Sequence, residues 1–285
     1  IPYRTQHRGG RRDRREEAPD DPKEGEEMSL RSMDQLLALY YREVTKVYLS
    51  FFALAVTIVQ PLIWIVFFGS SLSGLPTFFL ESYFHTNNYL SFLLPGELSV
   101  SSISMGMMAS MSLVQDKRLG YLKKIMVSPT RKYVIFLAKV LGGATRGLIQ
   151  VPILLVAGYL MGARIAFSAY LFLWVTVVFL VSMGFSSIYF MFNATSADWQ
   201  RPGLIMNLMT MPLMFSSTAL FPKEFFPWWL KLISDVNPVT YLAELGRLTF
   251  IQGAFDWTSF IALVGFAASF LALGAVVAEY KLTPE

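Results

Sequence analysis

Cysteine is absent from this chain of 285 residues, and histidine occurs only twice. The first absence excludes disulfides, thiolate metal sites and cysteine nucleophiles. The two histidines, His7 and His85, lie too far apart in sequence to suggest a metal site. The motif G-x-x-x-x-G-K-[ST] is also missing, so the sequence has no phosphate loop for binding ATP. H-E-x-x-H and G-x-S-x-G are missing as well, which argues against a membrane enzyme.

Charged residues are sparse and unevenly placed. Asp, Glu, Lys and Arg make up 15% of the sequence, whereas hydrophobic residues make up 54%. Residues 1–27 hold seven bases and eight acids and few large apolar side chains, which predicts a disordered charged tail. Beyond the tail, the aromatic residues lie inside apolar runs. A protein that binds nucleic acid clusters its bases with exposed aromatics on a soluble face, so we do not expect a nucleic-acid partner.

Six apolar runs have about the length needed to cross a bilayer, which is roughly 20 residues. The predicted spans are Val47–Phe68, Leu90–Val114, Tyr133–Met161, Ala166–Phe192, Gly203–Phe221 and Thr258–Ala278. Residues 28–285 are therefore expected to form one all-α integral membrane domain with about six transmembrane helices. The segment Gly69–Tyr89 contains no Lys or Arg, so we expect it to be an external loop. Both ends of the chain are then cytoplasmic.

Ser29–Lys46 is expected to form an amphipathic helix. Its apolar stripe consists of Met33, Leu36, Leu37, Tyr40 and Val44. Ser32 and Gln35 have the spacing of a capping box and mark the predicted start. Because a span follows directly, we expect this helix to lie in the membrane interface. A cytoplasmic helix packed on a partner is the alternative.

Gln115–Lys132 is a basic segment between the second and third predicted spans. Its six bases are Lys117, Arg118, Lys123, Lys124, Arg131 and Lys132. Short loops rich in Lys and Arg stay in the cytoplasm, which sets the predicted orientation. Leu119, Leu122 and Met126 recur at helical spacing, which predicts a short amphipathic helix that ends before Pro129. A solvated loop that only fixes the topology is the alternative.

Pro222–Gly253 is aromatic, amphipathic and too interrupted to cross a membrane. One predicted helix runs from Pro227 to about Ser234. A second starts at Asn237 followed by Pro238, which is the favoured order at a helix start. Each piece is shorter than a span, so we expect two short re-entrant helices in the outer leaflet.

Three charged residues lie within the predicted spans, namely Glu97, Lys139 and Arg146. Glu97 and Arg146 could approach each other between the second and third spans, and our hypothesis is that they pair. In the alternative, the two side chains reach opposite membrane interfaces.

Three stretches carry a resemblance to a known family. They are YLSFLLPGEL at Tyr89–Leu98, DKRLGYLKKIMVSPTRKYVIFLAKVLGG at Asp116–Gly143 and FPKEFFPWWLKLISDVNPVTYLAELGRLTFIQG at Phe221–Gly253. In this order and spacing they resemble the permease subunits of type-2 ABC exporters, in the branch of daunorubicin-resistance-type and polysaccharide-export-type permeases. The similar pattern covers about residues 30–280. Two features depart from it, namely the charged tail and Glu97, where that family leads us to expect an apolar residue.

The resemblance implies a mechanism in which two permeases form a dimer on a pair of ABC ATPase subunits. ATP and magnesium would bind to the ATPase, so this chain is expected to be neither an enzyme nor a cofactor-binding protein. The residues that match the ATPase-coupling helix are Asp116, Lys117, Arg118, Leu119, Gly120, Tyr121, Leu122, Lys123, Lys124 and Pro129. Candidates for the pathway and its gate are Glu97, Arg146, Pro227, Asn237, Pro238, Tyr241 and Arg247. We expect ATP-driven export of a hydrophobic drug, lipid-like or glycoconjugate substrate across a prokaryotic plasma membrane, with Pro222–Gly253 closing the outer end of the pathway.

Two functions from other classes stay open. A secondary carrier or channel would move its substrate without any ATPase. A membrane scaffold would move nothing and would not bind an ATPase.

Overall fold

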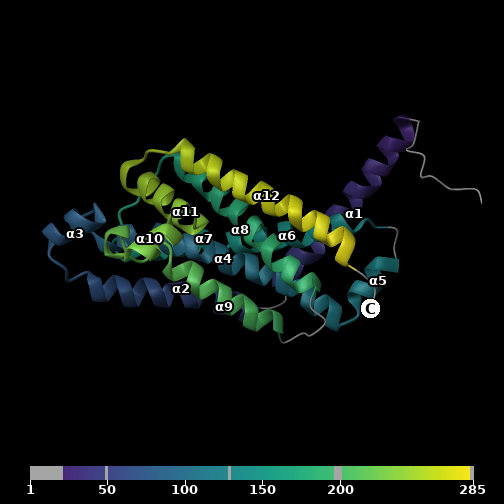
Figure 1. Cartoon of the computed structure of the whole chain (residues 1–285), viewed down its shortest axis with the longest axis horizontal. Helices are drawn as coiled ribbons and strands as arrows, with labels where there is room; N and C mark the ends of the chain where they lie inside the picture. The colour runs from purple at the N-terminus through teal and green to yellow at the C-terminus, as the bar shows by residue number, and fades with distance from the viewer. Residues whose placement is uncertain (1–21, 49–50, 128–129, 196–200, 283–285) are drawn as a thin grey trace, which may run out of the picture.

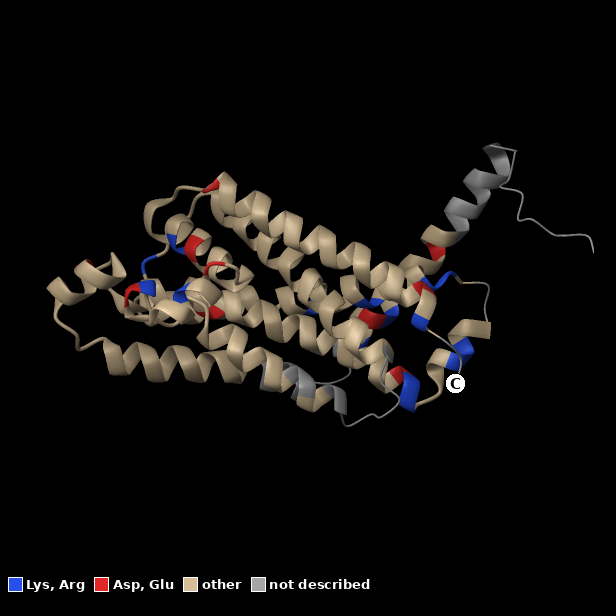
Figure 2. Cartoon of the chain, in the orientation of Figure 1, with Lys and Arg blue, Asp and Glu red and all other residues tan. Residues whose placement is uncertain are grey.

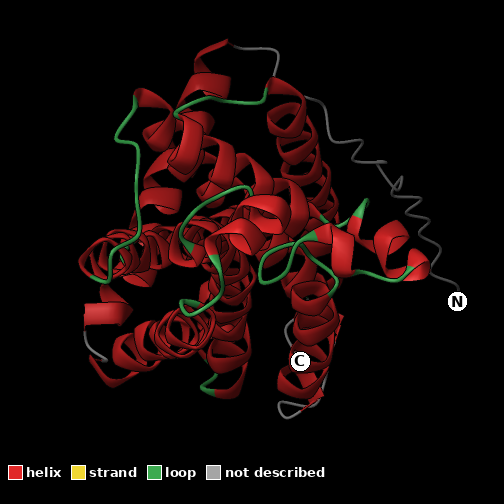
Figure 3. Ribbon diagram, turned by 90° about the vertical axis from the view of Figure 1, so that its left-hand side faces the viewer, coloured by secondary structure: helices red, strands yellow, loops and turns green. Residues whose placement is uncertain are grey.

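The computed structural model describes residues 22–48, 51–127, 130–195 and 201–282. Within these ranges the regular elements are helices, and no strand occurs (Figure 3). The expected all-α class is therefore confirmed. The helices form an elongated bundle, with α3 at one end and α5 at the other (Figure 1).

The first half of the bundle consists of α1 (Pro22–Tyr48), α2 (Phe51–Leu72), α3 (Thr77–Phe84), α4 (Tyr89–Arg118), α5 (Tyr121–Val127) and α6 (Lys132–Leu148). The second half consists of α7 (Gln150–Leu160), α8 (Ala169–Thr195), α9 (Arg201–Phe215), α10 (Trp228–Ser234), α11 (Pro238–Arg247) and α12 (Trp257–Lys281). A short 3-10 turn at Lys223–Phe225 precedes α10, and a π-helical turn at Leu248–Gln252 follows α11.

Within the described ranges, three helical segments are long and apolar enough to cross a membrane, namely Lys132–Leu160, Ala169–Ala194 and Trp257–Lys281. The stretch Ile58–Leu72 within α2 is apolar but shorter. These segments support a membrane protein, whereas the count of about six spans stays a prediction.

Helix α4 forms the centre of the bundle. It is buried without interruption from Tyr89 to Ile103. It packs most extensively against α8 and also contacts α2, α6 and α11. Leu94 and Leu98 of α4 and Trp174 of α8 are completely inaccessible. Any movement of α4 must therefore involve its neighbours.

Helix α4 runs antiparallel to α6 and α7, and the helices approach closely at glycines. A Cβ atom on Gly143 would lie 1.9 Å from Cβ of Ala109. A Cβ atom on Gly158, near the other end of the contact, would lie 2.6 Å from Cδ2 of Leu94. Small residues at helix interfaces permit such close packing. These contacts fix which residues of the two helices face each other.

The predicted third span, Tyr133–Met161, is one helical segment with an irregularity at Ile149. That residue divides it into α6 and α7. Pro152 lies three residues further on and has no backbone N–H, so it cannot donate to the carbonyl of Leu148. The missing hydrogen bond explains the division.

Several details of the predicted elements are wrong, and the second predicted span continues beyond Val114 to Arg118. Helix α1 begins at Pro22, so residues 22–27 are helical and the expected capping box at Ser32 lies inside the helix. The rest of the predicted tail lies outside the described residues. The loop expected at Gly69–Tyr89 contains α3. The fifth predicted span ends early, at Phe215, where a turn begins.

Charged side chains gather toward the two ends of the bundle (Figure 2). Lys123 and Lys124 lie exposed on α5, and Lys223 and Glu224 lie near α10 at the other end. Between the ends the helices are predominantly apolar, as expected for segments that cross a bilayer.

Candidate functional site

A tight turn at Leu119 and Gly120 connects α4 to α5. Gly120 has φ +70°, a left-handed conformation that favours glycine. The N–H of Leu119 donates to the carbonyl of Gln115 at 2.9 Å, and that of Gly120 donates to Lys117 at 3.1 Å. The predicted short helix is therefore present as Tyr121–Val127, and Leu119 lies in the turn before it.

Helix α5 presents one face to the bundle and another to its surroundings. Leu122 is only 4% exposed, whereas Leu119 is 66% and Val127 is 88% exposed. The prediction that Leu119 and Leu122 share one apolar face is therefore wrong. Lys123 and Lys124 are also exposed. Exposed apolar side chains next to bases form a surface that suits a protein partner.

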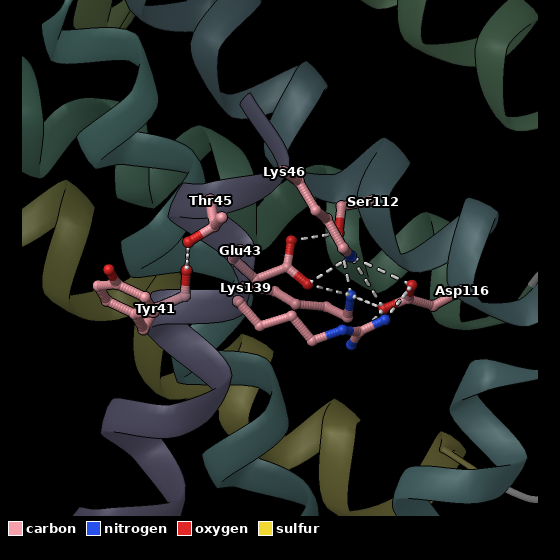
Figure 4. A network of polar contacts seen from close by, with 8 residues as sticks. Tyr41, Glu43, Thr45, Lys46, Ser112, Asp116 and Lys139 are labelled. Carbon is pink, nitrogen blue, oxygen red and sulfur yellow. Dashed lines mark hydrogen bonds and ion pairs between the residues drawn. The ribbon is translucent and has the colours of Figure 1, made fainter. Parts of the chain in front are cut away.

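Six polar side chains from α1, α4 and α6 meet close to the end of α4 that precedes α5. All of them except Arg42 are labelled in Figure 4. This Lys139 cluster consists of Arg42, Glu43, Lys46, Ser112, Asp116 and Lys139.

Lys139 lies at the centre of this cluster. Its Nζ lies 2.6 Å from Asp116 Oδ2, 3.2 Å from Glu43 Oε1 and 3.0 Å from Ser112 Oγ. Lys46 Nζ contacts the same two acids, at 2.8 Å from Glu43 and 3.1 Å from Asp116. The cluster thereby joins α1, α4 and α6 through ion pairs.

Arg42 connects the cluster to α5. Its Nη2 donates to Asp116 Oδ1 at 3.0 Å. Its guanidinium carbon also lies 5.1 Å from the ring centroid of Tyr121, over which Lys124 Nζ lies at 5.6 Å. Cations over an aromatic ring are attracted to its π-electrons. Through Arg42, helix α1 therefore contacts both the last turn of α4, at Asp116, and the first residue of α5, Tyr121.

Burial makes the Lys139 cluster costly to disrupt. The side chains of Glu43, Asp116 and Lys139 are only 2–3% exposed. Removing one partner of a buried ion pair costs about 3–5 kcal/mol, because it leaves an uncompensated charge. Burial raises the pKa of Glu43, but Lys139, Lys46 and the Ser112 hydroxyl outweigh this effect and hold that pKa below its ordinary value.

Two further lysines of the basic segment bind helix ends. Lys117 Nζ donates to the carbonyls of Asn193 and Ala194, at 3.0 and 3.1 Å, in the last turn of α8. Lys132 Nζ donates to the carbonyl of Glu279 at 2.9 Å, in the last turn of α12. A cation at a helix C-terminus stabilises the helix dipole. Part of the basic segment therefore supports the bundle itself.

The segment Pro222–Gly253, at the other end of the bundle, contains the two predicted short helices, whereas their re-entrant placement in a membrane stays a prediction. Helix α10 covers Trp228–Ser234, and α11 begins at Pro238. The side chain of Asn237 accepts a hydrogen bond from the N–H of Val239 at 3.0 Å and so caps α11. Gly253, with φ +63°, ends the segment.

The cap residue of α11 also binds the end of α9. Asn237 Nδ2 donates to the carbonyl of Leu213 at 2.7 Å and to Ser216 Oγ at 3.0 Å. The Tyr241 hydroxyl donates to the carbonyl of Asp235 at 2.7 Å, between α10 and α11. Helices α9, α10 and α11 thus form one hydrogen-bonded unit.

Arg247, the last residue of α11, joins this unit to α4. Its Nε donates to the carbonyl of Phe92 at 3.2 Å. Its guanidinium carbon also lies 3.5 Å from the centroid of the Phe92 ring. Its Nη2 donates to the carbonyls of Thr218 at 2.5 Å and Ala219 at 2.9 Å. We call this group of four residues the Arg247 clamp.

Glu97 and Arg146 do not pair, contrary to the hypothesis from the sequence. Glu97 Oε2 and Arg146 Nη2 are buried and lack a hydrogen-bond partner among the described residues. Between them, Gln150 Nε2 donates to Ser101 Oγ at 3.1 Å. Glu97 precedes Ser101 by about one turn, and Arg146 precedes Gln150 by about one turn. In antiparallel helices the two charges therefore lie on opposite sides of that bond, about 11 Å apart along the axis.

The other predicted site residues fall into two groups at opposite ends. Of the coupling candidates, Asp116 and Leu122 are buried, so neither belongs to an exposed docking surface. Pro129 lies outside the described residues. Of the gate candidates, Pro227, Asn237, Pro238, Tyr241 and Arg247 lie together around α10 and α11.

Sequence reasoning missed Arg42, Glu43, Lys46 and Ser112. One signal pointed to them. Lys139 lies in an apolar run, and a buried lysine requires an acidic partner. Glu43 precedes the first predicted span and Asp116 follows the second, so both lie at the same membrane face and were the available acids.

The helical bundle, its long apolar segments and its basic turn are consistent with a membrane protein. Residues 34–251 match the model of the ABC-2 type transporter family, so the chain belongs to that family. It is therefore an ABC transporter membrane subunit, a permease.

Several named proteins are similar to the chain. A transport permease of Cyanophora paradoxa, ycf38, is 28% identical over 203 residues, which cover 71% of this chain and 69% of that protein. The ycf38 permease of Porphyra purpurea is 26% identical over 247 residues, which cover 86% and 83%. The daunorubicin resistance ABC transporter permease DrrB1 of Streptomyces coeruleorubidus is 25% identical over 192 residues, which cover 67% and 65%.

Proposed function

We propose that this permease is the transmembrane subunit of an ATP-driven exporter. Two permease copies pair with two ATPase subunits, which bind and hydrolyse ATP. Helix α5 docks on the ATPase, and closure of the ATPase pair moves the bundle and expels the substrate. The cargo is a hydrophobic drug, lipid-like molecule or glycoconjugate, and the membrane is a prokaryotic plasma membrane.

The observation that carries this proposal is the attachment of α5. Leu119 and Val127 are exposed for docking, while Asp116, just before the turn, is bound to α1 and α6 through Lys46 and Lys139. A short helix with an exposed apolar surface and a rigid base can transmit a force that a solvated loop would dissipate.

The charge distribution supports the orientation. The α5 end carries the exposed bases Arg118, Lys123 and Lys124 in a short connection between two long helices. Short connections rich in Lys and Arg remain on the cytoplasmic side. The end with α3, α10 and α11 then faces outward.

A second permease copy would cover the flank of α9. Leu204, Leu208 and Met211 on this helix are 70%, 75% and 64% exposed. Within the chain, α9 packs only sparingly against α4 and α8. The same apolar flank would suit a hydrophobic cargo between the two copies, and one relative is named for daunorubicin resistance.

The proposal is tested by reconstituting the permease in lipid nanodiscs with an ABC ATPase encoded beside it. We expect the permease to co-purify with the ATPase and to change its ATP hydrolysis rate. The variant Leu119→Asp should insert and fold but lose this effect, whereas Leu119→Met should keep it. Equal rates for the wild type and Leu119→Asp would contradict the proposal.

Transport separates the exporter from the two alternatives. In proteoliposomes, an exporter loses all flux when ATP or the ATPase is omitted. A carrier or channel would retain ion-dependent flux without ATP, and a scaffold would give no flux under either condition.

A further inference from the structure

Three segments that are distant in sequence meet at one side chain, Arg247. These are α11, the α4 turn at Phe92 and the backbone of Thr218 and Ala219 just after α9. Gly96 makes the meeting possible, because a Cβ atom there would lie 2.0 Å from the carbonyl oxygen of Ala219. The backbone after α9 is thus held directly against α4.

Among the described residues, the guanidinium of this clamp donates hydrogen bonds to carbonyl groups and to one hydroxyl. Its Nη1 donates to Thr218 Oγ1 at 3.4 Å. No salt bridge of Arg247 to a carboxylate occurs among the described residues. A half-buried arginine that donates to carbonyl groups is held less tightly than one that donates to a carboxylate, so it can be released if a carboxylate comes within reach.

A carboxylate lies one turn away on the same helix. Glu244 Oε1 accepts from Thr218 Oγ1 at 3.3 Å, so the Thr218 hydroxyl lies between Glu244 and Arg247. Residues three apart on a helix are neighbours on its surface. If the backbone of Thr218 moves away, Glu244 is the nearest acceptor for the freed guanidinium.

Open space adjoins both side chains. A pocket of about 340 Å³ is lined by Arg247, Glu244, Thr218 and Phe92 together with other residues of this end. Arg247 can therefore change its rotamer toward Glu244 without displacing packed helices.

We propose that Arg247 is a positioning residue with two alternative partners, and that these partners set the outer gate. In the closed gate its guanidinium binds the carbonyls of Phe92, Thr218 and Ala219. In the open gate it binds Glu244, and the segment after α9 separates from α4. This inference rests on the proposed function, because that function places this end of the bundle on the outer side.

Cysteine labelling tests the proposal directly, because the chain has no native cysteine. Ser217 is 2% exposed and lies beside the clamp, so Ser217→Cys reports its opening with little change in shape. The purified variant in nanodiscs is treated with a water-soluble maleimide, and the labelling rate is measured by mass spectrometry. No ATPase or substrate is needed.

We expect Arg247→Gln to raise the labelling rate at least tenfold. Glu244→Gln should lower the rate below that of the parent, because the open state loses its charged acceptor. Arg164→Gln removes an exposed arginine at the same end and should leave the rate unchanged. If Arg247→Gln does not fold, Arg247→Lys keeps the charge but loses the planar fork, and should still raise the rate.

Three results would overturn the proposal. One is a labelling rate in Arg247→Gln, or in its Lys substitute, equal to that of the parent. Another is a rate in Glu244→Gln that equals or exceeds the parent rate. The third is an equal increase in Arg164→Gln, which would indicate general loosening of this end. The labelling is measured without the ATPase. A failure of the Arg247 proposal is therefore distinguishable from a failure of α5 to couple to an ATPase.

Discussion

Lys139 Nζ lies 2.6 Å from Asp116 Oδ2, although the two residues are 23 positions apart and belong to different helices. Asp116 is in the last turn of α4, and Lys139 is two turns into α6. The connection that contains α5 leaves from one helix and returns to the other. The ion pair therefore joins α4 to α6 at the two ends of this connection. A force on α5 would then act on both helices together.

Replacing Lys139 should destabilise the permease strongly. Lys139→Met leaves Asp116 and Glu43 buried with one cation fewer, which should lower the free energy of unfolding by about 3 kcal/mol. Chemical unfolding in detergent, followed by tryptophan fluorescence, measures the loss. Lys123→Met removes an exposed lysine and should change stability by less than about 0.5 kcal/mol. Equal stability of the two variants would show that the cluster contributes little.

Leu119 and Leu122 should give different defects. Leu119 is exposed in the turn, so Leu119→Asp should abolish ATPase stimulation and leave the melting temperature within about 2 °C of the wild type. Leu122 is buried, so Leu122→Asp should lower the melting temperature as well, because it buries an unpaired charge. Thermal melts and ATPase assays of the same preparations separate docking from packing. A large melting shift in Leu119→Asp would mean that Leu119 packs within the bundle.

The contribution of Glu43 to stability should depend on pH. A carboxyl group whose pKa is lowered by folding stabilises the protein above its unfolded pKa, and this stabilisation disappears as the pH falls through the folded value. At pH 7 we expect Glu43→Gln to melt below the wild type, and the gap should close as the pH falls below the ordinary carboxyl value of 4.5 and through the lowered pKa of Glu43. Asp34→Asn, which changes an exposed acid of the same helix, is the matched control. A gap that stays constant with pH would argue against an ionised Glu43 in the cluster.

Adding one methyl group at Gly96 should disturb the Arg247 clamp. In Gly96→Ala the new Cβ would lie 2.0 Å from a backbone oxygen of Ala219, so the segment after α9 must shift. We expect a loss of about 1–3 kcal/mol in stability. Gly265→Ala on α12, where nothing lies within 4 Å of the new atom, should be neutral or slightly stabilising. The two melting temperatures give the comparison, and similar values would show that Ala219 is not held against α4.

Sequence patterns within one helical turn correctly predicted structure that is determined by neighbouring residues, such as the start of a helix. Asn237 followed by Pro238 predicted the start of α11, because a cap and a fixed φ act within one helical turn. The same reasoning failed at Ser32, where a capping-box spacing occurs inside a longer helix. It also failed within Gly69–Tyr89. The absence of Lys and Arg there predicted an external loop, but the segment contains the helix α3.

Contacts between distant segments were beyond sequence reasoning. Glu43 and Lys139 are 96 positions apart, and only the packing of α1 on α6 brings them together. The expected pair of Glu97 and Arg146 failed for a related reason. Its formation depends on the register of two antiparallel helices, which the hydrophobic pattern leaves open and the glycine contacts determine.

Those glycine contacts also restrict how the permease can move. A piston-like shift of α4 by one turn toward its C-terminal end would place Ala109 and Leu94 against Lys139 and Leu154 in place of Gly143 and Gly158, and the helices would be forced apart. The two helices therefore resist sliding past each other in that direction. In the proposed exporter we expect alternation between two access states to involve the flank of α9, which packs only sparingly against α4 and α8 in the described part of the chain.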